Sequence, residues 1–370
     1  MSTHVAIAAI AKGHFDEIHV PTEKPQHGEV LLKVEYASMV AFDTYITDLG
    51  YATDTFPMVL GSNAAGTVVE LGPGVDDLKI GDRVTAFAYQ GFRSKAMQEY
   101  SIQSRTVSTK DLEIWPQVPD SMPLAAAATI PDHFVTAFHT LFNELGLGLP
   151  VPKTFHSLKS PPLSSAPILI YGAGSTTGQH AIQLLHAAGY KNIIVTASPK
   201  HHGYLASLGA TATIDYRSPS LAEEVAKAAG GDGKVALAVD CITAEGTIAK
   251  VAKVISQTGT VALLLPIKEG NNVRGEKDAQ MYMSIPEGRS PFSKSVNVRG
   301  VRTFLYQEDA FQKENVMPRI LPELLERGII QPNRIHLLDQ GTFKERVAVG
   351  LDLLRHNKVS GEKLVVKIEV

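Results

Sequence analysis

The chain of 370 residues contains one cysteine, Cys241. A disulfide within one chain needs two cysteines, and a zinc site built from cysteines needs several, so both are excluded. The 13 histidines show no HExxH or similar metal-binding spacing. No Gly-x-Ser-x-Gly motif occurs either, so a serine-hydrolase function has no support.

Long runs of one kind of residue are absent as well. No apolar run approaches the roughly 20 residues of a membrane-spanning helix, and the apolar stretch at 5–11 is too short for a signal sequence. The formal net charge is −3 without a basic or acidic run, so we expect no nucleic-acid or membrane-surface binding. A chain of this length with 44% hydrophobic and 20% charged residues predicts a globular protein of two domains, and we expect a cytoplasmic location.

The most informative stretch is a glycine-rich turn. Residues 167–171 predict a buried strand, and residues 179–189 predict a helix. The turn between them contains Gly172, Gly174, Ser175, Thr176, Thr177 and Gly178. Glycines let the backbone approach a pyrophosphate, and a helix N-terminus offers N–H groups and a positive dipole, so we predict a dinucleotide site. Three residues separate Gly174 from Gly178, one more than separate the last two glycines of the G-x-G-x-x-G fingerprint. A structural turn that binds no ligand is therefore the alternative.

The following strand indicates which dinucleotide is bound. Residues 192–198 predict the second strand of a βαβ unit, and it ends in Ser198 with Lys200 close behind, where many dinucleotide sites carry an acidic residue. An acidic residue repels a 2′-phosphate, whereas a hydroxyl and a cation attract it, so we predict NADPH as the cofactor. The alternative for Lys200 is an ordinary solvated lysine.

Short strand patterns precede the turn and predict a β-rich domain. They lie at 5–10, 30–36, 60–72 and 81–87 and are separated by Gly and Pro residues. A helix is predicted at 131–141, before the dinucleotide turn.

Several of these segments resemble the medium-chain dehydrogenase/reductase superfamily. The residues that carry the resemblance are Gly-x-x-x-x-Gly-x-Val at 61–68, Gly-x-Gly and then Gly-Asp-Arg-Val within 72–84, Asp-Cys-Ile at 240–242, and the ending at 354–366. The resemblance covers nearly the whole chain. The branch it points to is the zinc-free fungal group that contains trans-acting enoyl reductases of polyketide pathways and their toxin-cluster relatives.

The resemblance implies an α/β fold of two domains. A GroES-like, β-rich catalytic domain would comprise residues 1–132 and 312–370. A Rossmann NADPH-binding domain of residues 133–311 would be inserted between these two segments.

The chain departs from the zinc-dependent members of this family. They carry Gly-His-Glu where this chain has Gly61-Ser62-Asn63, and they have a ligand cysteine in the region 38–43, where this chain has none. Serine and asparagine cannot replace imidazole and carboxylate as zinc ligands. Alcohol oxidation without a Lewis acid is therefore not expected.

Reduction of a double bond conjugated to a carbonyl fits the same residues better. Hydride adds to the β carbon, and the enolate needs only hydrogen-bond donors and a proton source. We predict an NADPH-dependent, zinc-independent reductase whose substrate is a small α,β-unsaturated carbonyl compound or an enoyl thioester, free or as a carrier-bound polyketide. A quinone or aldehyde reductase, a zinc-free alcohol dehydrogenase and a non-catalytic NADPH-bound partner protein stay open.

The resemblance also implies individual roles. Tyr45 and Tyr51 are candidate proton donors or enolate partners, and Thr136 would lie beside the nicotinamide. Tyr216 would join the lysine around the 2′-phosphate, and Leu265 would lie near the nicotinamide amide. Plain packing is the alternative for the tyrosines, and for Thr136 the alternatives are packing or a bond to its own helix.

Three further segments give weaker predictions. Residues 151–166 are rich in Pro and Ser and predict a surface loop, and the polar stretch 268–295 predicts a mobile excursion that either helps to bind substrate or is inert. Residues 297–305 alternate like a strand, and in many relatives this segment pairs with its copy across a dimer. We expect a monomer or a homodimer that uses this edge.

Overall fold

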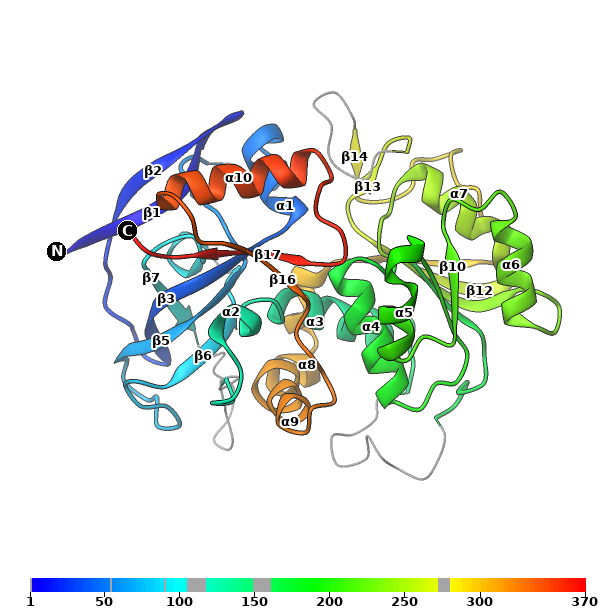
Figure 1. Cartoon of the computed structure of the whole chain (residues 1–370), viewed down its shortest axis with the longest axis horizontal. Helices are drawn as coiled ribbons and strands as arrows, with labels where there is room; N and C mark the ends of the chain where they lie inside the picture. Colours follow the sequence, from blue (N-terminus) through cyan, green and yellow to red (C-terminus); the bar gives the residue numbers. More distant parts are fainter. Residues whose placement is uncertain (1, 54, 90, 105–117, 149–160, 272–279) are drawn as a thin grey trace. The chain divides into compact units, whose positions relative to one another are not determined.

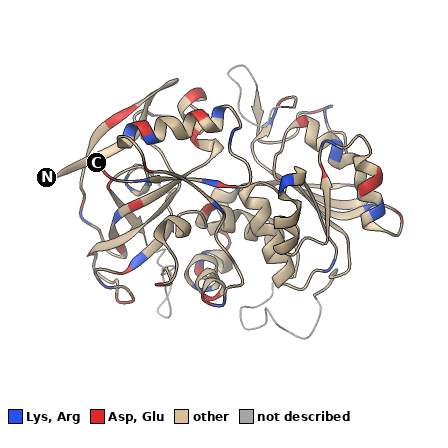
Figure 2. Cartoon of the chain, viewed as in Figure 1, with Lys and Arg blue, Asp and Glu red and all other residues tan. Residues whose placement is uncertain are grey.

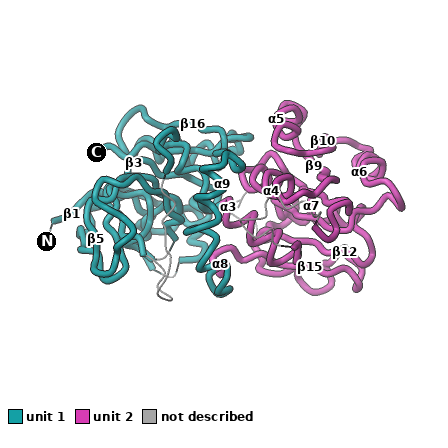
Figure 3. Tube along the Cα trace, turned by 90° about the horizontal axis from the view of Figure 1, so that it is seen from below, with its two compact units in different colours: residues 1–132, 307–370 teal, residues 133–306 magenta. Residues whose placement is uncertain are grey.

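The computed structural model describes the whole chain except residues 1, 54, 90, 105–117, 149–160 and 272–279. Its contacts divide the chain into two compact units (Figure 3). Unit 1 comprises residues 1–132 and 307–370, and unit 2 comprises residues 133–306, whereas the predicted second boundary was at 311/312. Basic and acidic residues are interspersed along the described elements (Figure 2), as the net charge of −3 suggests.

Unit 1 is built on two β-sheets (Figure 1). The larger sheet has the strand order β16-β17-β3-β5-β6, with β7 also paired to β3. The smaller sheet has the order β2-β1-β4. Strand β17 from the C-terminal end runs antiparallel to β3, with Val365 opposite Ser38, so both ends of the chain build this unit. The strands are β1 Thr3–Ala11, β2 His14–Pro21, β3 Glu29–Met39, β4 Met58–Val59, β5 Asn63–Leu71, β6 Arg83–Phe87, β7 Tyr100–Ser104, β16 Ile335–Leu338 and β17 Lys363–Lys367.

Short helices surround these sheets, and the long helix α10 (Phe343–Arg355) packs on the core. A capping box starts α10, because the Thr342 hydroxyl accepts from Glu345 N at 3.3 Å and the Glu345 carboxylate accepts from Thr342 N at 2.7 Å. Phe343, Val347 and Leu351 recur every four residues and are buried on one face. The other helical segments are α1 Ala41–Thr44, η1 Tyr45–Leu49, η2 Phe92–Ser94, α2 Leu124–Ala127, α8 Ala310–Asn315, η7 Val316–Ile320 and α9 Leu321–Glu326.

Unit 2 contains a parallel six-stranded sheet with the order β10-β9-β8-β11-β12-β15. Among the strands of this sheet β8 comes first in the sequence, and it lies in the middle of the sheet. The strand order reverses between β8 and β11. This is the doubly wound arrangement, which binds dinucleotides outside the carboxyl ends of the strands at the reversal. The strands are β8 Ile168–Tyr171, β9 Ile193–Ala197, β10 Ala212–Asp215, β11 Val235–Asp240, β12 Ile255–Leu264 and β15 Asn297–Val301.

The remaining elements of unit 2 follow or connect these strands. Helix α3 enters the unit from residue 131. The elements are α3 Pro131–Phe138, η3 His139–Glu144, α4 Thr176–Ala187, η5 Pro199–His201, α5 His202–Ser207, α6 Leu221–Ala229, α7 Glu245–Val254, β13 Ile267–Lys268, β14 Met281–Tyr282 and η6 Thr303–Glu308. In the described part of the chain, every helix is too short or too polar to cross a bilayer.

Two predicted elements have different limits in the structure. The helix after the glycine turn begins at Thr176 and not at 179, because Ser175 caps it. The predicted strand 297–305 ends at Val301, because Leu305 N donates to Arg302 O at 2.9 Å and closes a helical turn. Most of the predicted loop 151–166 and the centre of the excursion 268–295 lie outside the described residues, and β13 and β14 pair on either side of that centre.

Candidate active site

The glycine turn after β8 is shaped by two of its three glycines. Gly172 has φ +76°, and a Cβ there would lie 2.5 Å from Ile242 Cγ1. A Cβ on Gly178 would lie 2.6 Å from Ala173 Cα, so packing inside the protein requires both glycines. Gly174 differs, because its φ is not in the left-handed range and an added Cβ would meet His201 at an ordinary 3.6 Å. Glycine at 174 therefore leaves room in front of the turn that the protein itself does not fill.

The turn leads directly into the N-terminus of α4. Ser175 Oγ accepts from Gly178 N at 3.1 Å, and Thr196 on β9 holds the turn by accepting from Gly172 N at 3.0 Å. The side chain of Thr176 bonds to His133 Nδ1 at 2.7 Å, and Thr177 is buried. The first N–H groups of a helix lack partners within the helix, and the helix dipole is positive at this end. A 12-residue helix entered through such a turn is suited to receive phosphate.

The two neighbouring strands end at the same edge of the sheet. Their register pairs Ala197 on β9 with Asp215 on β10, so Ser198 and Tyr216 leave adjacent strands side by side. Lys200 is exposed and lies in the short helical turn η5 that follows Ser198. The structure thus places the three residues predicted for the 2′-phosphate at one edge.

Arg217 is a second cation at this edge that sequence reasoning gave no role. Its guanidinium carbon lies 5.5 Å from the centre of the Tyr216 ring, and two of its nitrogens donate to the Asp215 carboxylate at 3.0 Å. This pairing lowers the pKa of Asp215, so the carboxylate is charged and balances the arginine. In the sequence, the run Asp-Tyr-Arg at 215–217 was the only indication that Asp215 and Arg217 form an ion pair.

Leu265 and Thr136 are each bonded to the segment at the end of β15, in unit 2. Leu265 follows β12, its N–H donates to Val301 O at 3.3 Å, and its side chain packs against Gly300. The Thr136 hydroxyl on α3 accepts from the Thr303 hydroxyl at 3.0 Å. The Thr136 hydroxyl therefore has a hydrogen-bond partner outside its own helix, in the segment that follows β15.

Tyr45 and Tyr51 lie together in unit 1. Their ring centres are 6.4 Å apart at 90°, and Phe42 contacts both rings edge-on, with ring centres 6.1 and 5.8 Å away. Tyr45 is 5% exposed, while Tyr51 is only half-buried. Burial raises the pKa of both phenols, so both carry their proton at neutral pH and can donate a hydrogen bond.

The positions where zinc-dependent relatives bind metal hold a hydrogen-bonded polar network. Asn63 Nδ2 donates to Ser38 Oγ at 2.7 Å, and Asn63 Oδ1 accepts from Asp132 N at 3.0 Å. The Asp43 carboxylate accepts from the N–H groups of Val40 and Gly61, each at 2.9 Å. Among the residues that the structure describes, no three His, Cys, Asp or Glu side chains gather as a metal site would require.

Charged side chains complete this network and were missed by sequence reasoning. Lys363 Nζ lies 2.9 and 3.1 Å from the two carboxylate oxygens of Asp132, and both side chains are at most 9% exposed. Lys95 is also buried and attracts Asp43. Burial raises the pKa of Asp43 and lowers the pKa of Lys95 and Lys363, while the opposite charges counter these shifts.

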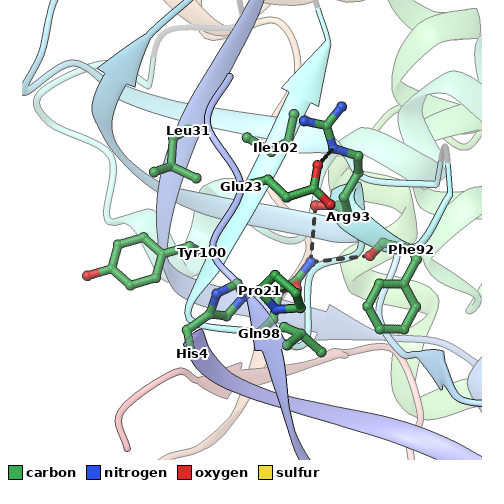
Figure 4. A pocket seen from close by; sticks show the side chains of 10 residues that line it. His4, Pro21, Glu23, Leu31, Phe92, Arg93, Gln98, Tyr100 and Ile102 are labelled. Atoms are coloured by element: carbon green, nitrogen blue, oxygen red, sulfur yellow. Dashed lines mark hydrogen bonds and ion pairs between the residues drawn. The ribbon is translucent and has the colours of Figure 1, made fainter. Parts of the chain in front are cut away.

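A cavity of about 80 Å³ in unit 1 lies among β1, β2 and β7 and contains none of the predicted site residues (Figure 4). His4 bonds through its two ring nitrogens to the Thr22 hydroxyl at 2.8 Å and the Gln98 amide oxygen at 3.1 Å. Arg93 pairs with Glu23 at 3.0 Å. His4 and Arg93, two of the polar residues that line the cavity, are therefore bonded to other groups of the protein.

Comparison with known proteins places this geometry in a family. The family model described as "Alcohol dehydrogenase GroES-like domain" matches residues 26–110, and the one described as "Zinc-binding dehydrogenase" matches residues 176–311. The chain is 31% identical over 341 residues to the trans-enoyl reductase himH of Aspergillus japonicus, which covers 92% of this chain and 90% of that protein. The chain belongs to the medium-chain dehydrogenase/reductase superfamily.

Within this superfamily the chain groups with fungal enoyl reductases. It is 28% identical over 368 residues to the enoyl reductase component lovC of the lovastatin nonaketide synthase of Aspergillus terreus, which covers 98% of this chain and 96% of that protein. The solved CurK enoyl reductase shares the fold with a TM-score of 0.73 over 99% of both chains at 18% identity. The predicted fold class is confirmed, and the protein is an oxidoreductase with a nicotinamide-dinucleotide-binding fold.

Proposed function

We propose that the protein is an NADPH-dependent enoyl reductase that works without zinc. One observation carries the proposal. The glycine turn of a dinucleotide site is present, while Ser62 and Asn63, at the positions of zinc ligands in zinc-dependent relatives, cannot bind the metal. Asn63 is instead hydrogen-bonded to protein groups on both sides. The enoyl reductases among the relatives support the same reaction class.

The selectivity for NADPH rests on the edge formed by β9 and β10. Ser198 and the exposed Lys200 offer a hydroxyl and a cation, and Tyr216 is 38% exposed beside them. The carboxylate of Asp215, at the end of β10, is already neutralised by Arg217. A 2′-phosphate would meet net positive charge here, whereas a free ribose hydroxyl would find no unpaired carboxylate among these residues.

The reaction then needs a place for a hydride acceptor and a source of one proton. When bound, NADPH supplies the hydride that adds to the β carbon of the substrate. We assign Thr136 and Leu265 to the nicotinamide end of the site. Both tyrosines keep their proton at neutral pH, and Tyr51 is the better candidate for the proton donor because it is more exposed than Tyr45. Tyr45 would hold the Tyr51 ring through its edge-on contact.

The rival functions share the fold and differ in the acceptor. A quinone or aldehyde reductase, or a zinc-free alcohol dehydrogenase, would also bind the dinucleotide, and a non-catalytic partner protein would bind it without turnover. NADPH oxidation should be followed with enones, enoyl thioesters (free and carrier-bound), quinones, aldehydes and, with NADP⁺, simple alcohols. We expect turnover with the enones or thioesters. Turnover restricted to quinones or aldehydes would replace the proposal with the corresponding rival.

A further inference from the structure

The position of the first glycine of the dinucleotide turn depends on a different segment of unit 2. The space that a Cβ of Gly172 would need is filled by Ile242, whose Cγ1 would lie 2.5 Å away. Ile242 belongs to the turn between β11 and α7, and this turn continues the sheet because Cys241 N donates to Tyr171 O at 3.0 Å. Whatever fixes the turn at 241–244 therefore also fixes one wall of the phosphate site.

A single buried carboxylate organises that turn. Asp240 is 0% exposed, and its Oδ1 accepts from Ile242 N at 2.9 Å and from Thr243 N at 2.8 Å. Its Oδ2 accepts from the hydroxyl of Thr247, in the first turn of α7, at 2.6 Å. Burial raises the pKa of Asp240, and these three bonds oppose that shift because they favour the charged carboxylate.

The same bonds hold a residue in an unfavourable backbone conformation. Thr243 has φ +53°, a left-handed conformation that a β-branched residue rarely adopts. Its hydroxyl donates to Asp240 O at 2.7 Å, and its own carbonyl accepts from Lys268 N at 2.9 Å. The turn is thus held from β11 on one side and from β13 on the other.

Lys268 bonds to the same turn through its backbone N–H and has a buried ammonium that the Asp240 carboxylate attracts. Its side chain is buried with 6% exposure, and among the described residues its only hydrogen bond is a long one of 3.5 Å to Pro266 O. Burial lowers the pKa of Lys268 to about 8, and the attraction of Asp240 opposes this shift. A buried carboxylate and a buried ammonium are each unfavourable alone, so each depends on the other.

We propose that Asp240 is a positioning residue of the dinucleotide site: its carboxylate fixes the turn at 241–244, which holds Ile242 against Gly172. The inference rests on the dinucleotide binding in the proposed function, and not on the choice of substrate. It predicts that disturbing this carboxylate weakens cofactor binding although the Asp240 side chain does not belong to the glycine turn.

The test compares NADPH binding by full-length variants in the absence of substrate. Asp240→Asn keeps the shape but removes the charge and the acceptor for Thr247, and it should raise the Kd for NADPH about tenfold or more, the scale of one lost charge-assisted hydrogen bond. Thr247→Val removes the hydroxyl that bonds to Asp240 Oδ2 and to the backbone of Ala244, and it replaces Asp240→Asn in the test if that variant does not fold. With enough NADPH to saturate the variant, kcat should stay within about twofold of wild type, because positioning of the cofactor site changes KM rather than the chemical step.

A matched control separates positioning from general loss of stability. Thr211 accepts from Ile193 N at 2.9 Å and donates to Ile193 O at 3.1 Å, at the opposite, amino end of the sheet. Thr211→Val should lower the melting temperature and leave the Kd for NADPH unchanged. An unchanged Kd in both Asp240→Asn and Thr247→Val, or an equal loss of binding in Thr211→Val, would overturn the inference.

Because the Kd for NADPH is measured without substrate, a protein that binds NADPH but reduces no enoyl substrate would refute the proposed function and leave this inference standing.

Discussion

Gly174→Ala should separate a cofactor role of the glycine turn from a purely structural one. In the unliganded protein the new methyl group meets its nearest neighbour at 3.6 Å, and the backbone is not left-handed. A Gly→Ala change at a compatible position reduces the entropy of the unfolded chain and should raise the free energy of unfolding by about 0.4–1 kcal/mol. A bound pyrophosphate, however, would have to approach the same backbone, and the methyl group would hold it away.

The loss of one charge-assisted hydrogen bond from that backbone is worth about 1.5–3 kcal/mol, which corresponds to a Kd for NADPH raised about 10- to 150-fold. Thermal unfolding without cofactor and a fluorescence titration with NADPH measure the two effects on the same protein. Gly148→Ala is the matched control, since its new Cβ also meets its nearest neighbour at 3.6 Å, and it should bind NADPH like wild type.

Gly178→Ala provides the contrast, because the clash with Ala173 Cα at 2.6 Å should lower stability and binding together. A Gly174→Ala protein that is stable and binds NADPH as tightly as wild type would refute the reasoning, since it would show that no phosphate approaches this turn.

Four further predictions concern the cofactor, the proton donor, the metal and the pH. Lys200→Ala should weaken NADPH binding by about 1–3 kcal/mol and hardly affect NADH, and equal affinity of the wild type for both cofactors would contradict the selectivity. Tyr51→Phe should slow enoyl reduction about 10²–10⁴-fold with cofactor binding intact, and if both it and Tyr45→Phe keep full activity the tyrosine assignment fails. Activity should survive prolonged chelation, and one tightly held zinc per chain in elemental analysis would count against zinc independence. Burial lowers the pKa of Lys268 from 10.5 to about 8, so between these pH values the unfolded chain binds more protons than the folded one. Relative to Lys268→Met, the free energy of unfolding of the wild type should therefore rise by about 3 kcal/mol from pH 8 to 10.5 in denaturant titrations, and a flat difference would contradict the burial of a titrating ammonium.

Local patterns in the sequence predicted most of the fold, because strands and caps are written in neighbouring residues. The apolar run before Gly172 is β8, and the strand pattern at 192–198 is β9. The edge strand was predicted too long, because alternation continues past Val301 although a turn closes there through a backbone bond at Arg302.

The buried charge pairs could not be predicted in the same way. Lys363 and Asp132 are 231 positions apart in the chain and meet only when both ends of unit 1 fold together. Asp240 was noticed only as the end of a strand, and Lys268, whose ammonium it attracts, lay in a segment predicted as a polar excursion. A lysine in a polar stretch is expected to be solvent-exposed, and only the bridge between Lys268 and Ala244, in the turn after β11, shows that it lies in a buried place.

The position of the transferred hydride tests the central claim most directly. The protein should be incubated with NADPH carrying deuterium at C4 of the nicotinamide and with an enoyl thioester, and the product analysed by NMR and mass spectrometry. The account predicts a saturated product with deuterium on the β carbon. Deuterium on the carbonyl carbon of an alcohol product, with the double bond intact, would contradict it.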